Sequence, residues 1–166
     1  MKYRFVKALA NDMAGLMAGY LEKRFMSGLG TDHGSIIIVP VPLHRLRLNW
    51  RGFNQAEIIG NKIGTCLGLD FRQDILGRKH RRAPQALIAN RESRIANMKG
   101  VFECLKPELM LGKIVLLVDD VATTGSTLDD CARALKGAGA KEVIGFVFAR
   151  GTPASDKKFA IIKKVL

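Results

Sequence analysis

Two adjacent carboxylates, Asp119 and Asp120, stand just before a run of hydroxyl-bearing residues, Thr-Thr-Gly-Ser-Thr at positions 123–127. Adjacent carboxylates are costly to bury without partners, so we expect them to face a crevice and accept hydrogen bonds from sugar hydroxyls. The run that follows offers hydroxyl groups, backbone N–H groups and a flexible glycine at the start of a predicted helix, a suitable cradle for a phosphate dianion. A ribose that carries a 5′-phosphate satisfies both halves of the segment.

This segment joins a predicted strand to a predicted helix. Residues 113–118, Lys-Ile-Val-Leu-Leu-Val, give the strongest strand signal in the chain and are almost continuously apolar, as a central parallel strand would be. Apolar residues then recur at helical spacing until the Gly-Ala-Gly of positions 137–139: Leu128, Cys131, Ala132, Leu135 and Ala138. Parallel sheets bind their ligands at the carboxyl ends of strands, so the position of the segment agrees with its composition.

Further helices and strands alternate along the chain. A stripe at spacings of three and four predicts an N-terminal helix within residues 1–30: Phe5, Leu9, Met13, Leu16, Met17 and Tyr20. Residues 35–39, 101–104 and 143–148 predict strands, and positions 53–67 return to helical spacing before Gly68. This alternation predicts an α/β fold, a single domain over residues 1–166 with a central, mostly parallel sheet flanked by helices.

Composition limits the class of protein. The chain has 166 residues, 48% of them apolar, which suits one domain, and a net charge of +12, which favours polyanionic partners. The three cysteines are far apart, so neither a disulfide framework nor a zinc ribbon is indicated. No apolar run reaches the roughly 18 residues of a membrane span, and acidic residues interrupt the N-terminus. We therefore expect no signal peptide, no membrane span and a cytoplasmic location.

Three familiar motifs that resemble positions 119–127 in part each leave some of the segment unexplained. A solvated turn before an N-capped helix would explain Ser126 or Thr127, but it would not explain the two aspartates. A Walker B strand requires a Gly-x-x-x-x-Gly-Lys-Ser/Thr loop elsewhere, which the sequence lacks. A response-regulator receiver places its acidic pair after the first strand, whereas Asp119 and Asp120 follow a late one.

An apolar strand, two acidic residues and a Thr-Thr-Gly-x-Thr loop resemble the phosphoribosyl pyrophosphate (PRPP) signature of the type I phosphoribosyltransferases. Two further motifs, Val-Pro-Val-Pro-Leu-His at 39–44 and Arg-Gly-Phe-Asn-Gln at 51–55, are similar to those of the competence protein F family. This resemblance extends over about residues 2–150 and includes Gln85, Leu87, Arg91, Arg94, Asn97 and Phe102. It implies a type I phosphoribosyltransferase-like fold.

The resemblance also implies a set of site residues. PRPP is expected to bind the two aspartates and the loop formed by Ala122, Thr123, Thr124, Gly125, Ser126 and Thr127. The turn that corresponds to the pyrophosphate loop contains Val41, Pro42, Leu43 and His44. A basic flexible loop at 78–94 takes the place of the mobile catalytic loop, which makes catalytic candidates of Lys79, Arg81 and Arg82 besides Asp119 and Asp120. Three residues either line the pocket or cap a helix: Arg51, Asn54 and Gln55.

The implied reaction uses Mg²⁺ that is bound with PRPP and has no direct ligand from the protein. Purine-salvage relatives carry an aspartate at the position of Thr123, so this chain lacks that proton acceptor. Members of the family commonly begin with a cysteine-rich, zinc-binding segment, and the resemblance starts after the place where that segment would lie. The C-terminal tail, residues 151–166, offers little aromatic surface for a nucleobase, so the acceptor is not identified.

Two functions stay open at this point. One is a phosphoribosyltransferase that releases pyrophosphate. The other is a non-catalytic protein of DNA uptake, which senses PRPP or handles single-stranded DNA, because a PRPP loop can persist after catalysis is lost. The expected partners are accordingly PRPP, single-stranded DNA, competence proteins and a second copy of the chain in a homodimer.

Overall fold

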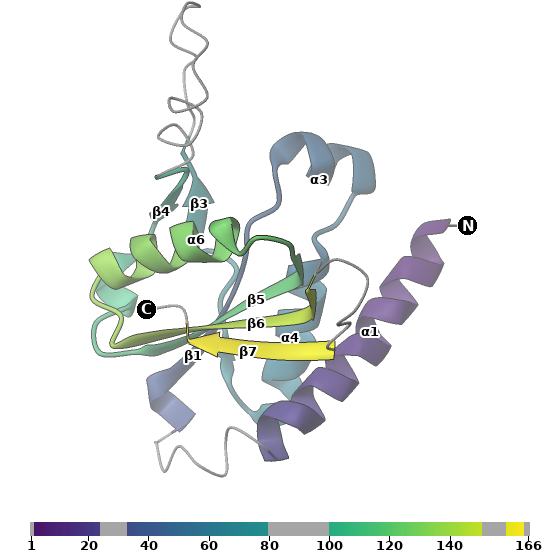
Figure 1. Cartoon of the computed structure of the whole chain (residues 1–166), viewed down its shortest axis with the longest axis horizontal. Helices are drawn as coiled ribbons and strands as arrows, with labels where there is room; N and C mark the ends of the chain where they lie inside the picture. The colour runs from purple at the N-terminus through teal and green to yellow at the C-terminus, as the bar shows by residue number, and fades with distance from the viewer. Residues whose placement is uncertain (1, 24–32, 80–99, 151–158, 165–166) are drawn as a thin grey trace, which may run out of the picture.

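A five-stranded sheet forms the centre of the fold (Figure 1). The computed structural model describes residues 2–23, 33–79, 100–150 and 159–164. The strands lie in the order β2 (Asp70–Phe71), β1 (Ile36–Pro40), β5 (Ile114–Ala122), β6 (Glu142–Arg150) and β7 (Phe159–Lys164). All neighbouring pairs are parallel except β6 and β7, which are antiparallel. The prediction of an α/β fold with a central, mostly parallel sheet is confirmed.

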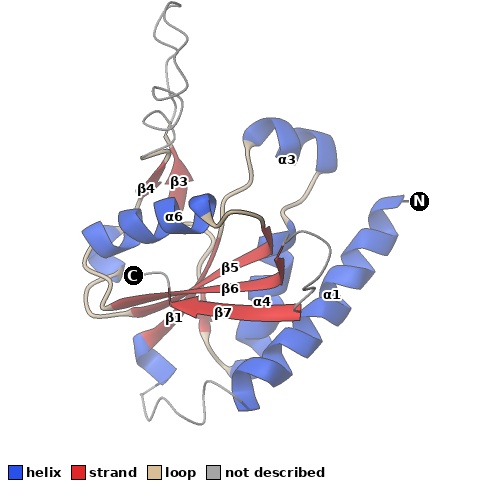
Figure 2. Cartoon of the chain, in the orientation of Figure 1, coloured by secondary structure: helices blue, strands red, loops and turns tan. Residues whose placement is uncertain are grey.

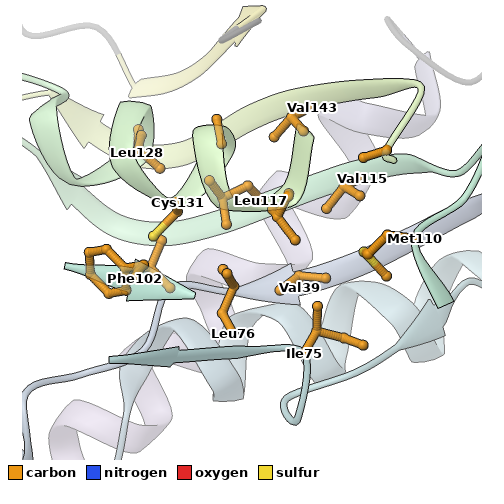
Figure 3. Packing of buried hydrophobic residues seen from close by; sticks show 14 of the residues in the cluster. Val39, Ile75, Leu76, Phe102, Met110, Val115, Leu117, Leu128, Cys131 and Val143 are labelled. Carbon is orange, nitrogen blue, oxygen red and sulfur yellow. The ribbon is translucent and has the colours of Figure 1, made fainter. Parts of the chain in front are cut away.

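The two central strands, β1 and β5, are buried on both faces, which explains their continuous apolar runs. They lie in register, with Val39 beside Leu117. Because successive side chains point to opposite faces of a strand, these two residues belong to the core under the helix α6 (Ser126–Gly137), which Figure 3 shows from close by. Ile38 and Val118 belong to the core on the other face.

Helices cover both faces of the sheet (Figure 2). One face packs against α1 (Lys2–Leu21) and α4 (Gln55–Leu67), and α6 lies on the other. The N-terminal helix is confirmed, but part of its predicted apolar stripe is wrong, because Leu16 and Tyr20 are exposed. The buried residues of this helix lie at spacings of one, three and four: Ala14, Met17, Ala18 and Leu21. Short alanine side chains let α1 pack closely, a preference that hydrophobic spacing alone does not reveal.

A small second sheet lies beside the main one. It pairs β3 (Leu76–Arg78) with β4 (Phe102–Cys104) in antiparallel orientation, and the Lys79 N–H donates a hydrogen bond to the Val101 oxygen at 2.9 Å. The strand predicted at 101–104 is thus present. Of the basic segment 78–94, the structure describes only the first two residues, so Arg81 and Arg82 lie outside the described residues. The remaining short elements are η2 (His33–Ser35) and η3 (Pro107–Leu109).

The elements that the sequence did not predict include the short strands β2 and β3, the helix α3 (Arg45–Arg51) and the strand β7. The helix α3 projects beyond the end of β1, capped by His44 at its start and by Gly52 in the left-handed region at its end (Figure 1). Within the segment predicted as a C-terminal tail, residues 159–164 form the strand β7 at the edge of the sheet. None of the helices in the described residues is both long and apolar enough to cross a membrane.

Candidate functional site

The strands β1 and β5 end together at one edge of the sheet, where a cleft of about 670 Å³ opens. Beyond β1 the parallel pairing continues by one bond, from the Val41 N–H to the Val118 oxygen at 2.9 Å. The loop after β1 therefore runs directly beside the last residues of β5. This arrangement places the turn that contains Val41, Pro42, Leu43 and His44 in the lining of the same cleft as Asp119 and Asp120.

The two carboxylates are partly buried in this lining and are held by the backbone that follows them. The Asp120 N–H donates to the Asp119 Oδ1 at 2.9 Å, and the Val121 N–H donates to the Asp120 Oδ1 at 2.8 Å. Within the described residues neither side chain has a cationic partner within 4.0 Å. Burial and the neighbouring Asp120 charge raise the pKa of Asp119 to about 7. Hydroxyl donors from a bound sugar would favour its charged form.

The loop after β5 encloses a smaller space of about 50 Å³, which exceeds the roughly 30 Å³ that one water molecule occupies. Gly125 adopts a left-handed conformation with φ of 83° and is the N-cap residue of α6, where it offers no side chain. The Thr124 Oγ1 accepts the Ser126 N–H at 3.3 Å, and the Thr124 and Ser126 hydroxyls lie 2.8 Å apart. N–H groups and hydroxyls at a helix N-terminus suit an anion. Besides Asp119, the lining includes the residues for which the phosphate loop is a prediction: Ala122, Thr123, Thr124, Gly125, Ser126 and Thr127.

The small space and the cleft adjoin each other. Both are lined by Asp119, Thr123 and Thr127. A ligand that fills both would therefore pass one end into the hydroxyl loop and would place its middle beside Asp119.

The loop after β1 is fixed by a buried amide. Asn54 is 4% exposed, and its Nδ2 donates to the Val41 oxygen and to the Glu57 Oε1, both at 3.1 Å. Its Oδ1 accepts the Ala56 N–H at 3.1 Å and so caps α4. Of the two roles left open for Asn54, the structure shows both, because the residue lines the cleft while its amide is fully used. Both backbone groups of Val41 are used as well, so Val41 positions the loop and offers no donor.

His44 and Arg51 lie at the two ends of α3. The His44 Nδ1 accepts the Leu46 N–H at 3.2 Å, which assigns the proton of a neutral ring to Nε2. Arg51 donates from Nη1 to the Gln55 Oε1 at 3.3 Å, and both side chains line the cleft. Arg51 and Gln55 thus line the pocket, the first of the two alternatives, and together they join α3 to the start of α4.

Comparison with known proteins decides the family. Residues 54–165 match the phosphoribosyl transferase domain. The chain belongs to this family. Competence protein F of Haemophilus influenzae is 34% identical over 116 residues, which is 68% of this chain and 49% of that protein. DNA utilization protein YhgH of Escherichia coli strain K12 is 34% identical over 106 residues, which is 64% of this chain and 45% of that protein. The chain thus spans about half the length of these relatives, and the resemblance to competence protein F is confirmed.

A solved structure described as the allosteric regulatory enzyme of purine biosynthesis is similar in fold. The TM-score is 0.50 at 18% sequence identity, over 83% of this chain and 25% of that chain. At this identity the likeness concerns the fold alone.

Two arginines line the cleft although the motifs did not indicate them. Arg47 comes from α3 and Arg78 from β3. Arg47 lies four positions before Arg51 on the same side of a helix, a signal that becomes visible only once α3 is known. Arg78 is the last residue of β3, and its place at the cleft depends on how the small sheet packs. Lys79 follows it, but its side chain is not part of the cleft lining in the described residues.

A third missed residue, Asp130, anchors the second sheet from α6. It is 4% exposed and accepts N–H groups of Gly100 at 2.8 Å, Val101 at 2.7 Å and Phe102 at 3.3 Å. Arg133 donates to it at 2.9 Å. A single aspartate in the middle of an amphipathic helix gives no sequence signal for such a role. The described residues contain no group of three or more His, Cys, Asp or Glu side chains arranged to hold a metal ion.

Proposed function

We propose that this chain binds PRPP and transfers its phosphoribosyl group to a nitrogen nucleophile, with release of pyrophosphate. The observation that carries the proposal is the pair of adjoining spaces that meet at Asp119. PRPP has a matching shape, because its 5′-phosphate and its diphosphate lie at two ends of one ribose. A ligand with a single anionic end would leave half of the cleft unused.

In this proposal each part of the cleft has one task. The loop from Thr123 to Thr127 holds the 5′-phosphate, and Asp119 and Asp120 accept hydrogen bonds from the ribose hydroxyls. The bond between C1 and the diphosphate oxygen breaks, and its electron pair leaves with pyrophosphate. The lone pair of the nucleophile forms the new bond to C1, and the nitrogen then loses its proton to solvent water. The nearby carboxylates stabilise the positive charge that develops on the ribose.

Magnesium is proposed to enter with the diphosphate. This hard cation would be held by oxygens of the diphosphate and by water, with no direct ligand from the protein, and the carboxylates of Asp119 and Asp120 in the cleft lining would lie near its charge. When bound, Mg²⁺ neutralises charge on the leaving group. The amide of Asn54 contributes by holding the turn at Val41–His44, which is proposed to receive the pyrophosphate.

Calorimetry with PRPP and MgCl₂ tests binding, and pyrophosphate release across a panel of nucleobases and amines tests catalysis. The double variant Asp119→Asn, Asp120→Asn should weaken PRPP binding by about a hundredfold, because each lost charged acceptor removes a strong hydrogen bond. A matched control is Asp70→Asn, an exposed carboxylate on β2. Equal PRPP affinity in the double variant and the wild type would refute the site.

A second function is favoured by one surface feature. Trp50 on α3 is 73% exposed and is followed by Arg51, in a chain of net charge +12. Aromatic rings beside arginines stack the bases of single-stranded nucleic acid. Two relatives carry names that refer to competence and to DNA utilization. The alternative is therefore a PRPP-sensing or single-strand-handling protein without transferase activity.

The sequence contains a single tryptophan, so its fluorescence reports directly on α3. Titration with a poly-dT oligonucleotide should quench this fluorescence if the chain handles single-stranded DNA, and the affinity should fall steeply with salt because phosphate contacts release counterions. Quenching without pyrophosphate release would favour the alternative. Pyrophosphate release without quenching would favour the transferase.

A cytoplasmic location and a homodimer also remain proposals. Cys66, Cys104 and Cys131 are unpaired thiols, which agrees with a reducing compartment. Sedimentation analysis would test the homodimer.

A further inference from the structure

Three guanidinium groups line the cleft, and they come from two elements. Arg47 and Arg51 belong to α3, and Arg78 ends β3. None of the three lines the smaller space of the hydroxyl loop. The cationic part of the site is therefore separate from the proposed 5′-phosphate cradle, and the two parts adjoin at Asp119.

These arginines differ from other arginines of the same chain in how their charge is compensated. Arg72 pairs with Asp74 at 3.0 Å, and Arg133 pairs with Asp130 at 2.9 Å. Within the described ranges no carboxylate lies within 4.0 Å of the Arg47 or Arg78 guanidinium, although Asp119 and Asp120 share their cleft. Arg51 donates to a neutral amide. Among the described residues the fold thus brings these guanidinium groups together without a direct ion pair to any of them.

Arg78 is held in place before any ligand arrives. Its guanidinium lies 4.9 Å from the centre of the Phe102 ring, and Phe102 is itself buried in the core. In the antiparallel pairing of β3 with β4, Arg78 lies directly opposite Phe102. This register holds the guanidinium group over the ring. Burial lowers the pKa of Arg78, and the charge of Arg47 lowers it further. Arg78 is thus a partly buried cation that lies near the exposed cation Arg47, and two neighbouring cations favour a ligand with more than one negative charge.

We infer that Arg47 and Arg78 bind the diphosphate of PRPP and are catalytic residues of the proposed reaction. A guanidinium fork matches the oxygens of a phosphate group, and two forks from different elements match a diphosphate. When the C1–O bond breaks, the electron pair and the negative charge move onto the diphosphate, where these arginines stabilise them. The inference rests on the proposed function. It assigns the leaving group to Arg47 and Arg78, which are not among the catalytic candidates Lys79, Arg81 and Arg82 of the basic loop.

The test compares three ligands on the full chain: magnesium pyrophosphate, PRPP and ribose 5-phosphate, each titrated by calorimetry. Arg47→Gln and Arg78→Gln should each weaken pyrophosphate and PRPP binding by about tenfold or more, and should leave ribose 5-phosphate affinity within about twofold. Arg78→Lys keeps the charge but loses the fork, so we expect an intermediate loss. Lys62→Gln removes one exposed charge on α4 and should change none of the three affinities.

The outcomes separate this inference from the proposed function. If the wild type binds all three ligands and the arginine variants bind pyrophosphate equally well, the inference is wrong and the proposed function stands. If the variants weaken ribose 5-phosphate as much as pyrophosphate, the arginines do not select the diphosphate, and the inference is again wrong. A wild type that binds pyrophosphate in an Arg78-dependent way but not ribose 5-phosphate supports the arginine site and contradicts the PRPP assignment. Circular dichroism of each variant checks that it is folded.

Discussion

The side chain of Asn54 donates a hydrogen bond to the backbone oxygen of Val41 at 3.1 Å, across 13 positions of sequence. This bond joins the start of α4 to the loop after β1, and the same amide nitrogen reaches the carboxylate of Glu57. One buried amide thus sets the relation between a helix and the proposed pyrophosphate loop. The loop geometry depends on it because the Val41 oxygen has no other hydrogen-bond donor among the described residues.

Replacing this amide should destabilise the fold and loosen the loop together. Asn54→Ala removes a helix cap worth about 1 kcal/mol and leaves a buried carbonyl without its donor, which costs about 1–3 kcal/mol. We expect the free energy of unfolding to fall by about 2–4 kcal/mol in urea denaturation. Asn61→Ala changes an exposed residue on the same helix and should cost under about 0.5 kcal/mol. A similar loss in both variants would contradict the role of Asn54.

Asp130→Asn should lower stability and change its pH dependence. Burial alone would raise the pKa of Asp130, but hydrogen bonds from Gly100, Val101, Phe102 and Arg133 outweigh it and lower the pKa. Its stabilisation is therefore present above the unfolded pKa near 3.8 and is lost as the pH falls through the folded value. The variant should lose about 1–3 kcal/mol at pH 7 and should unfold less steeply on acidification. Asp129→Asn, the neighbouring carboxylate on α6, should retain the wild-type acid transition.

Asp119→Asn should make the free protein more stable and the ligand weaker. The folded pKa of about 7 lies above the ordinary value of 3.8, so Asp119 lowers stability as the pH rises between these values. At pH 8 the variant should gain free energy of unfolding on the order of 2 kcal/mol while PRPP affinity falls.

The same carboxylate should give ribose binding a pH dependence. Because hydroxyl donors favour the charged form of Asp119, ribose 5-phosphate should bind more tightly as the pH rises through about 7. The ligand phosphate also titrates, near pH 6, so the measured quantity is the affinity ratio of wild type to Asp119→Asn. A ratio that stays constant from pH 6 to pH 8 would remove Asp119 from the sugar site.

Gly125→Ala should strain the phosphate loop without a steric clash. A Cβ at this position meets nothing within 4 Å, but φ of 83° is unfavourable for an L-residue by roughly 1–2 kcal/mol. Gly68→Ala imposes a similar strain at φ of 64°, where a Cβ also has open space, at the far end of α4. Both variants should lose similar stability in thermal unfolding. Only Gly125→Ala should weaken ribose 5-phosphate binding, and an equal effect in Gly68→Ala would show a global cause.

The part of the site that could be predicted is local in sequence. The end of β5, the hydroxyl loop and the start of α6 follow one another in the sequence. The motif alone was therefore sufficient to predict that Asp119 and Gly125 lie in one site. The turn at Val41–His44 was placed by resemblance, and the fold brings it to the same cleft. Local strand and helix signals were sufficient for the α/β class because each of these elements has its own period.

The rest depended on tertiary structure. In α3 the apolar residues Leu46, Leu48 and Trp50 recur every second position and are exposed, so the helix depends on its caps and has no apolar face to signal it. The strand β7 forms by antiparallel pairing with β6, so it could not be predicted from its own residues. Arg78 reaches the cleft only because the small sheet docks beside α6. No spacing rule connects such residues, since they meet only after folding.

The pleat of β5 makes its two neighbouring aspartates unequal. Side chains alternate along a strand, so Asp119 follows the parity of Leu117 toward α6, and Asp120 follows Val118 toward α4. Only Asp119 borders the hydroxyl loop. A one-residue insertion or deletion in β5 before Asp119 would move each aspartate to the opposite face of the sheet. It would also exchange the faces to which the apolar side chains of the shifted part of the strand point. Evolution can therefore alter either acid singly, but it cannot shift the pair without rebuilding both hydrophobic layers beneath them.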